Sequence, residues 1–174
     1  EALFKAGDFQ RSIDIYERAA YEQPGHSDAI NAGYAAILTY NDLAKTYQPK
    51  MDAVTKESLN KSRRESIERF AKHFPGAKQT PALLNGLANE FFAEKNYALA
   101  RKASMEVLIK PLASADILYG SGLVYAHSSF ELGQFKEAES GYERLLGFNK
   151  GKDKSVLSER LAASIYKQAE QEPD

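Results

Sequence analysis

The sequence predicts an all-α protein built from antiparallel helical hairpins. Apolar residues recur at helical spacing along most of the 174 residues. The alternation typical of strands is nearly absent, and most Gly and Pro residues fall between the periodic runs. The joins between these runs are short, so successive helices are expected to pack antiparallel.

The expected helices form five successive parts of a single domain over 1–174. We expect helices over 1–6, 9–22, 28–47, 52–73, 79–95, 97–110, 114–132, 135–147 and 154–171. They group into a partial repeat (1–25), an extended hairpin (26–75), two repeats (76–112 and 113–150) and a terminal or capping helix (151–174). The chain begins in the middle of an apolar periodic run, at Glu1-Ala2-Leu3-Phe4, and is expected to be a fragment of a longer chain.

The first part, GDFQRSIDIYERAA, is interpreted as the second half of a repeat. The pair Gly7-Asp8 predicts a turn, and Phe9 follows it as an aromatic plug between two helices. The small or aromatic positions after Phe9 are expected to pack in the core; they are Ser12, Tyr16 and Ala19. Pro24 is expected to end the unit.

The second part departs from this length. Pro24 and Pro75 lie 51 residues apart, which is too long for one standard helical hairpin. Two extended helices joined through Tyr47-Gln48-Pro49-Lys50 explain the spacing, and the second carries an apolar stripe of Leu59, Ile67, Phe70 and Phe74.

The next two parts repeat one pattern at a spacing of 38 residues, measured from Tyr97 to Phe135. In each, an aromatic follows a polar turn and a small residue comes three positions later. Two further positions, one and two turns later on the same helix, are expected to be buried. In the earlier copy the four residues are Tyr97, Ala100, Ser104 and Val107, and in the later copy they are Phe135, Ala138, Tyr142 and Leu145. The first helix of the earlier copy carries Leu84, Leu87, Ala88 and Phe91 on one face. The final run, SVLSERLAASIYKQAEQ, is either a capping helix or the first half of a further repeat.

These residues resemble the tetratricopeptide (TPR) repeat family, with the best match at Leu84, Leu87, Ala88, Phe91, Tyr97, Ala100 and Val107. In the last copy, Gly122 and Ser129 stand where the family has large residues. The resemblance implies a right-handed superhelix, a TPR-like α-solenoid, whose concave groove is lined by the first helix of each hairpin.

The family register then predicts a binding groove for a peptide segment or partner helix. Its expected contact residues are Asn31, Asn85, Asn89, Phe92, Leu123, His127 and Phe130. Asn85 and Asn89 are one helical turn apart, so their amides are expected to point the same way toward an extended backbone. Phe92, Leu123 and Phe130 would hold apolar side chains, and His127 would add a pH-sensitive contact. The alternative is that these residues are merely solvated, or that they pack against another part of the parent chain.

The resemblance implies a non-enzymatic scaffold or adaptor for protein–protein interaction. The alternative is a structural TPR segment that packs against other domains of a larger cell-envelope protein or complex in assembly, secretion or export. The run SIERFAKHFPGAKQTPALLNGLANEFFAEKNYALARK is similar to bacterial cell-envelope TPR proteins. It favours the periplasm or cell envelope over the cytoplasm without establishing the compartment. A partner could instead dock on the projecting hairpin 28–74. The partner's identity, the oligomeric state and the choice between groove, convex face and long hairpin as the binding surface stay open.

Other functions have little support in the sequence. There is no cysteine, and His26, His73 and His127 fall in different predicted units, so no catalytic, metal or cofactor site is expected. Gly120-Ser121-Gly122 lies inside a helical run, where close helix packing explains it better than a phosphate loop. The net charge of −1 and the interleaved acidic residues argue against nucleic-acid binding, and no apolar run is long enough to span a membrane. Carboxylates such as Glu17, Glu65, Glu68, Glu137 and Glu139 are expected on solvated outer helix faces.

Overall fold

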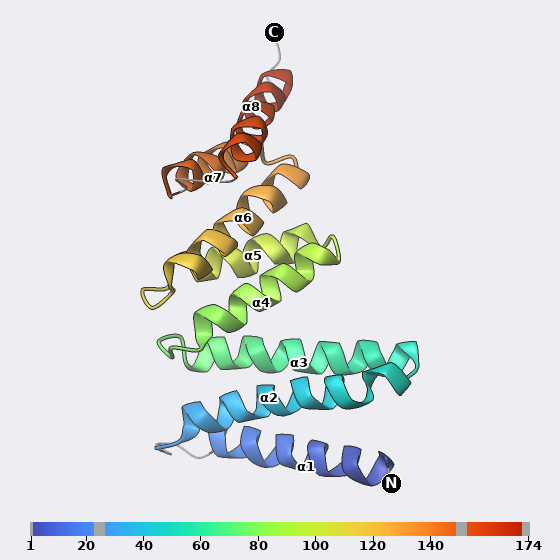
Figure 1. Cartoon of the computed structure of the whole chain (residues 1–174). Helices are drawn as coiled ribbons and strands as arrows, with labels where there is room; N and C mark the ends of the chain where they lie inside the picture. Colours follow the sequence, from blue (N-terminus) through green and yellow to red (C-terminus); the bar gives the residue numbers. More distant parts are fainter. Residues whose placement is uncertain (1, 23–26, 149–152, 172–174) are drawn as a thin grey trace. The chain divides into compact units, whose positions relative to one another are not determined.

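The computed structural model describes residues 2–22, 27–148 and 153–171, without the side chains of residues 2–7 and 48. Within these ranges every regular element is a helix, which confirms the all-α class (Figure 1). The elements are α1 (Ala2–Tyr21), α2 (Ala29–Tyr47), a short 3-10 helix η1 (Gln48–Lys50), α3 (Ala53–His73), α4 (Thr80–Ala93), α5 (Tyr97–Leu108), α6 (Ala115–Glu131), α7 (Phe135–Phe148) and α8 (Lys154–Gln171). Pro24 and His26 lie outside the described residues.

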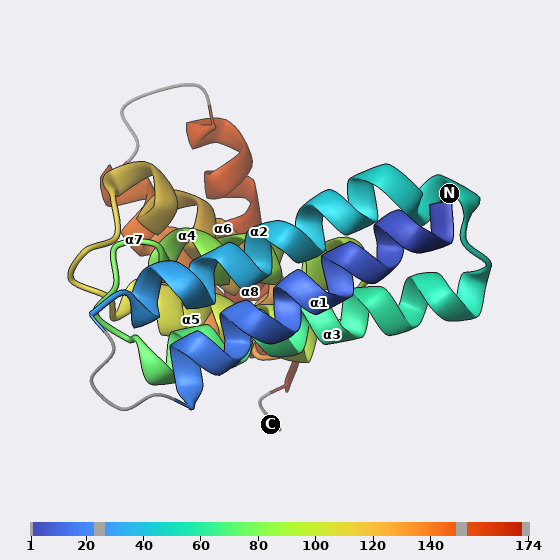
Figure 2. The same cartoon turned by 90° about the horizontal axis from the view of Figure 1, so that it is seen from below.

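The chain divides into two compact units, Glu1–Thr80 and Pro81–Asp174. In unit 1, α2 packs against both α1 and α3, and Figure 2 shows the three long helices running alongside one another. Their shared core contains Ile13, Tyr40, Leu43 and Tyr47. The side chain of Asp52 caps the start of α3 by accepting a hydrogen bond from the Thr55 amide at 2.9 Å. The expected long hairpin is therefore present as α2 and α3.

The prediction of a turn at Gly7-Asp8 is wrong. The backbone of α1 is one continuous helix from Ala2 to Tyr21, and the Ser12 hydroxyl donates to the Asp8 carbonyl at 2.8 Å. Gly and Asp are weak helix formers, but neither blocks a helix as Pro does, so packing against α2 is enough to keep the helix intact. Tyr16, expected in the core, is 38% exposed.

The expectation that Glu17 lies on a solvated face is also wrong. Its half-buried carboxylate accepts hydrogen bonds from the Ser66 hydroxyl at 3.2 Å and from the Arg69 guanidinium at 3.1 Å. The Arg69 guanidinium also lies 4.0 Å from the ring centroid of Tyr21. Burial, with the charge of Glu17 adding to it, raises the pKa of Tyr21 to about 12. This polar cluster joins α1 to α3, two helices that are not neighbours in sequence.

In unit 2, α6 packs against α5 and α7, and α7 packs against α8. The turns before α5 and α7 have the same geometry. Lys95 and Gly133 take left-handed φ angles of 59° and 72°. The amide of the following residue donates to a carbonyl five residues back, from Asn96 to Phe91 in one turn and from Gln134 to Ser129 in the other. Both turns are therefore helix C-termini of the Schellman type. Each turn is covered by an edge-on aromatic pair, Phe92–Tyr97 or Phe130–Phe135. The two turns lie 38 residues apart, so the sequence repeat is also a structural repeat.

Burial follows the same period. Ala88, Ala126 and Ser164, one on each of α4, α6 and α8, are fully buried and successively 38 residues apart. Ala100 and Ala138 are likewise both inaccessible to solvent. By this burial pattern, α8 occupies the position of a first helix in the 38-residue series.

Glycines set the closest approach between α6 and α7. A methyl group at Gly141 would lie 2.9 Å from the Cβ of Ala126, and one at Gly122 would lie 3.0 Å from Leu145 Cδ2. Ser121, between the two glycines of Gly120-Ser121-Gly122, is fully buried. Close helix packing therefore explains this motif, as the sequence indicated.

Candidate functional site

The predicted groove residues of unit 2 lie on α4 and α6, and most of them are less open than expected. Asn85 is half-buried, and its carbonyl oxygen accepts a hydrogen bond from the Ser121 hydroxyl at 2.8 Å. Asn89 is exposed, and its amide donates to the backbone carbonyl of Asn85 at 2.7 Å. These bonds orient both amides. Among the residues that the structure describes, nothing bonds to the NH₂ group of Asn85 or to the side-chain oxygen of Asn89, so both can meet a further partner.

The aromatic groove positions contact one another across the two helices. Phe92 and His127, both half-buried, have ring centroids 6.1 Å apart. Leu123 and Phe130 pack against the core that α6, α7 and α8 share, so each is partly a structural residue. Asn31 lies on α2 in the other unit, where its amide donates to the Asp28 carboxylate at 2.9 Å.

His127 is held inside unit 2 and does not project freely. Its Nδ1 atom lies 2.7 Å from the Tyr142 hydroxyl, whose pKa burial raises to about 12. Burial, reinforced by the positive charge of Arg160, lowers the pKa of His127, and the charge of Glu131 opposes this only in part. The ring is therefore neutral, and its Nδ1 atom shares a hydrogen bond with the Tyr142 hydroxyl in which the tautomer of the ring sets donor and acceptor.

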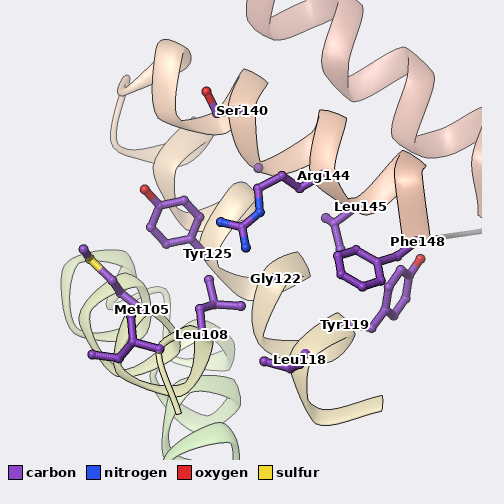
Figure 3. A pocket seen from close by; sticks show the side chains of 12 residues that line it. Met105, Leu108, Leu118, Tyr119, Gly122, Tyr125, Ser140, Arg144, Leu145 and Phe148 are labelled. Carbon is purple, nitrogen blue, oxygen red and sulfur yellow. The ribbon is translucent and has the colours of Figure 1, made fainter. Parts of the chain in front are cut away.

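A second feature was not foreseen: an apolar pocket of about 430 Å³ between α5, α6 and α7 (Figure 3). Its volume falls in the range usual for ligand pockets. Figure 3 shows Met105 of α5 on one side and Phe148 of α7 on the other, and they are 52% and 67% exposed. Ile109, the residue that follows α5, also lines the pocket and is 73% exposed. Large apolar side chains with this much exposure, gathered around one pocket, are typical of a binding surface.

Small residues line the pocket at repeat positions. Gly122 contributes to its α6 wall, whereas the equivalent position of the preceding copy is the buried Leu84. Gly141 replaces Ala103 in the same way on α7. At both glycines a Cβ would meet the facing helix, Leu145 for Gly122 and Ala126 for Gly141, so the small residues bring α6 and α7 close together beside the pocket. The sequence signal was the departure at Gly122 from the large residue of the family pattern, which could have directed attention here.

Arg144 is the charged residue among the described residues that line this pocket. In Figure 3 its guanidinium points into the space between Tyr125 and Leu108. It makes no hydrogen bond or ion pair with any part of the chain that the structure describes. The hydroxyl of Tyr125, by contrast, accepts a long hydrogen bond of 3.5 Å from Arg101. The pocket thus combines an apolar wall with one uncompensated positive charge.

Comparisons with protein-family models, with curated proteins and with solved structures found no match to this chain. Within residues 2–22, 27–148 and 153–171, no group of three or more His, Cys, Asp or Glu residues is arranged to hold a metal ion. In the same ranges, no helix combines the length and the apolar character that crossing a bilayer requires.

Proposed function

We propose that the chain belongs to a right-handed, TPR-like superhelix that acts as a non-enzymatic scaffold or adaptor for protein–protein interaction. The observation that carries this proposal is the 38-residue repeat of turn geometry, aromatic pairing and buried small residues in unit 2. Stacked repeats of this kind present one continuous surface made of equivalent helices, and such surfaces serve for binding extended partners.

The groove formed by the first helices is the proposed binding surface. Asn85 offers an NH₂ donor and Asn89 an oxygen acceptor one helical turn later, because their other polar atoms are engaged. A peptide backbone has one C=O and one N–H per residue, which such a pair can satisfy together. Phe92 and His127 present half-buried ring surface beside it.

The test is an affinity pull-down with the 174-residue chain and a double variant, Asn85→Asp with Asn89→Ala. Aspartate keeps the oxygen that Ser121 needs but removes the donor, so the fold should survive. We expect captured partner to fall about ten-fold or more, because two hydrogen bonds contribute about 1–3 kcal/mol together. Asn41→Ala, which removes an exposed amide from α2, is the control. Undiminished capture by a double variant of unchanged helicity would contradict the groove assignment.

A structural role within a larger cell-envelope protein is the second candidate. It is favoured by apolar side chains on α8, where Val156, Ile165 and Tyr166 are 55%, 49% and 63% exposed. A further part of the parent protein could cover them. If the purified chain captured only its own parent protein, this second candidate would replace the adaptor.

A further inference from the structure

The pocket between α5, α6 and α7 has a guanidinium at its edge, because Arg144 lines it and is exposed to solvent. Arg144 stands among apolar side chains, and no described carboxylate pairs with it. A ligand that covers the pocket removes water from this charge, which strengthens a correctly placed ion pair and penalises a missing one. An occupant without a negative group would therefore bury an unpaired cation.

We propose that this pocket binds a peptide segment of a partner protein in which a carboxylate lies beside bulky apolar side chains. The carboxylate pairs with Arg144, whose planar fork suits two parallel hydrogen bonds. The neighbouring apolar side chains of the peptide fill the pocket, which Met105, Gly122 and Phe148 line.

The exposed rim favours a peptide over a small carboxylic acid. A ligand confined to about 430 Å³ would leave much of Met105, Ile109 and Phe148 in water. A chain that continues past the pocket covers this rim as well. Met105 adds adaptability, because its unbranched thioether repacks around different side chains.

This site goes beyond the proposed groove and does not depend on it. The pocket uses Leu118, Tyr119, Gly122 and Tyr125 of α6, whereas the groove uses Leu123, His127 and Phe130, so the two sets share no residue although Tyr119 lies one turn from Leu123. At 3.6 residues per turn, Leu118, Gly122 and Tyr125 lie on roughly the opposite side of the helix from the groove residues. Asn89→Ala should therefore leave pocket binding unchanged, so failure of one proposal is distinguishable from failure of the other.

The test begins with the 174-residue chain on an array of random synthetic peptides. We expect the bound peptides to be enriched in Asp or Glu adjacent to Leu, Ile, Met or Phe. The tightest peptide is then labelled, and its affinity is measured by fluorescence polarisation. Arg144→Gln should weaken binding at least ten-fold, whereas Lys136→Gln, which removes an exposed charge from the same helix α7, should change it less than two-fold.

Two further arms identify the contact and the kind of ligand. Replacing the peptide's acidic residue by its amide should weaken binding to the wild-type chain but cause no further loss with Arg144→Gln. Ile109→Glu changes a residue that is 73% exposed, so it should reduce binding without disturbing the fold, which circular dichroism checks. Decanoate, a carboxylate with an apolar tail, should compete only at concentrations at least a hundred-fold higher than the peptide.

The proposal is overturned if the array shows no acidic enrichment, or if Arg144→Gln binds the selected peptide as tightly as the wild type. Decanoate competing as well as the peptide would likewise overturn the assignment to a partner segment.

Discussion

At the scale of single residues, side-chain partners change what each predicted contact can do. His127 carries an imidazole at a groove position, but the Tyr142 hydroxyl already occupies its Nδ1 atom. Burial and, to a lesser extent, the positive charge of Arg160 on α8 lower the pKa of His127 and disfavour protonation, while Glu131 on α6 opposes them. The residue therefore contributes to stability as a neutral ring.

The pH dependence of stability follows from that lowered pKa. The unfolded chain binds a proton at His127 as the pH falls through the usual value of 6.5, whereas the folded chain resists it. The contribution of His127 to the free energy of unfolding should therefore be fully present above about pH 6.5 and decrease as the pH falls toward the lowered pKa of the folded state. We expect the melting temperature to drop more between pH 7.5 and 5.5 for the wild type than for His127→Gln. Equal drops in the two proteins would show that this histidine is not the source.

At the scale of elements, glycines decide how close the helices come. Gly141 on α7 faces Ala126 on α6 without room for another methyl group. Gly86 on α4 has no atom within 4 Å of the position that a Cβ would take. The same residue type thus has opposite consequences on two helices of one unit.

A matched pair of variants tests this difference. Gly141→Ala should lower the free energy of unfolding by about 1 kcal/mol, because overpacking of about 1–3 kcal/mol outweighs the gain in helix propensity. Gly86→Ala should raise it by about 0.5–1 kcal/mol, since only the propensity changes. Urea denaturation followed by circular dichroism measures both. A stabilised Gly141→Ala would mean that α6 and α7 separate easily.

At the scale of the whole molecule, the proposed superhelix predicts dimensions that solution scattering measures. A compact domain of this chain length has a radius of gyration of roughly 16 Å. Stacked repeats grow in one direction, so the radius of gyration should be clearly larger. A value near the compact limit, at a concentration where the chain is monomeric, would contradict the superhelical arrangement.

The sequence by itself determined the features that depend on local pattern. Helical periodicity identified the α-class, and the recurrence of small and aromatic residues identified the 38-residue unit, since Ala88, Ala126 and the turn aromatics follow directly from spacing along the chain. The turns before Tyr97 and Phe135 were readable because polar residues at a helix end signal a local stop. The same signal at Gly7-Asp8 misled, because a weak local preference gives way to packing against α2.

Only the tertiary structure decided which side chains meet across helices. Three hydrogen bonds join residues that are 15 to 52 positions apart in the sequence: Ser121 with Asn85, Arg69 with Glu17, and His127 with Tyr142. The pocket beside Arg144 likewise depends on three helices at once, two of which contribute glycines at positions where the preceding copy has larger side chains. Such features come from the distances between helix surfaces after folding, and a one-dimensional pattern of residue types does not contain those distances.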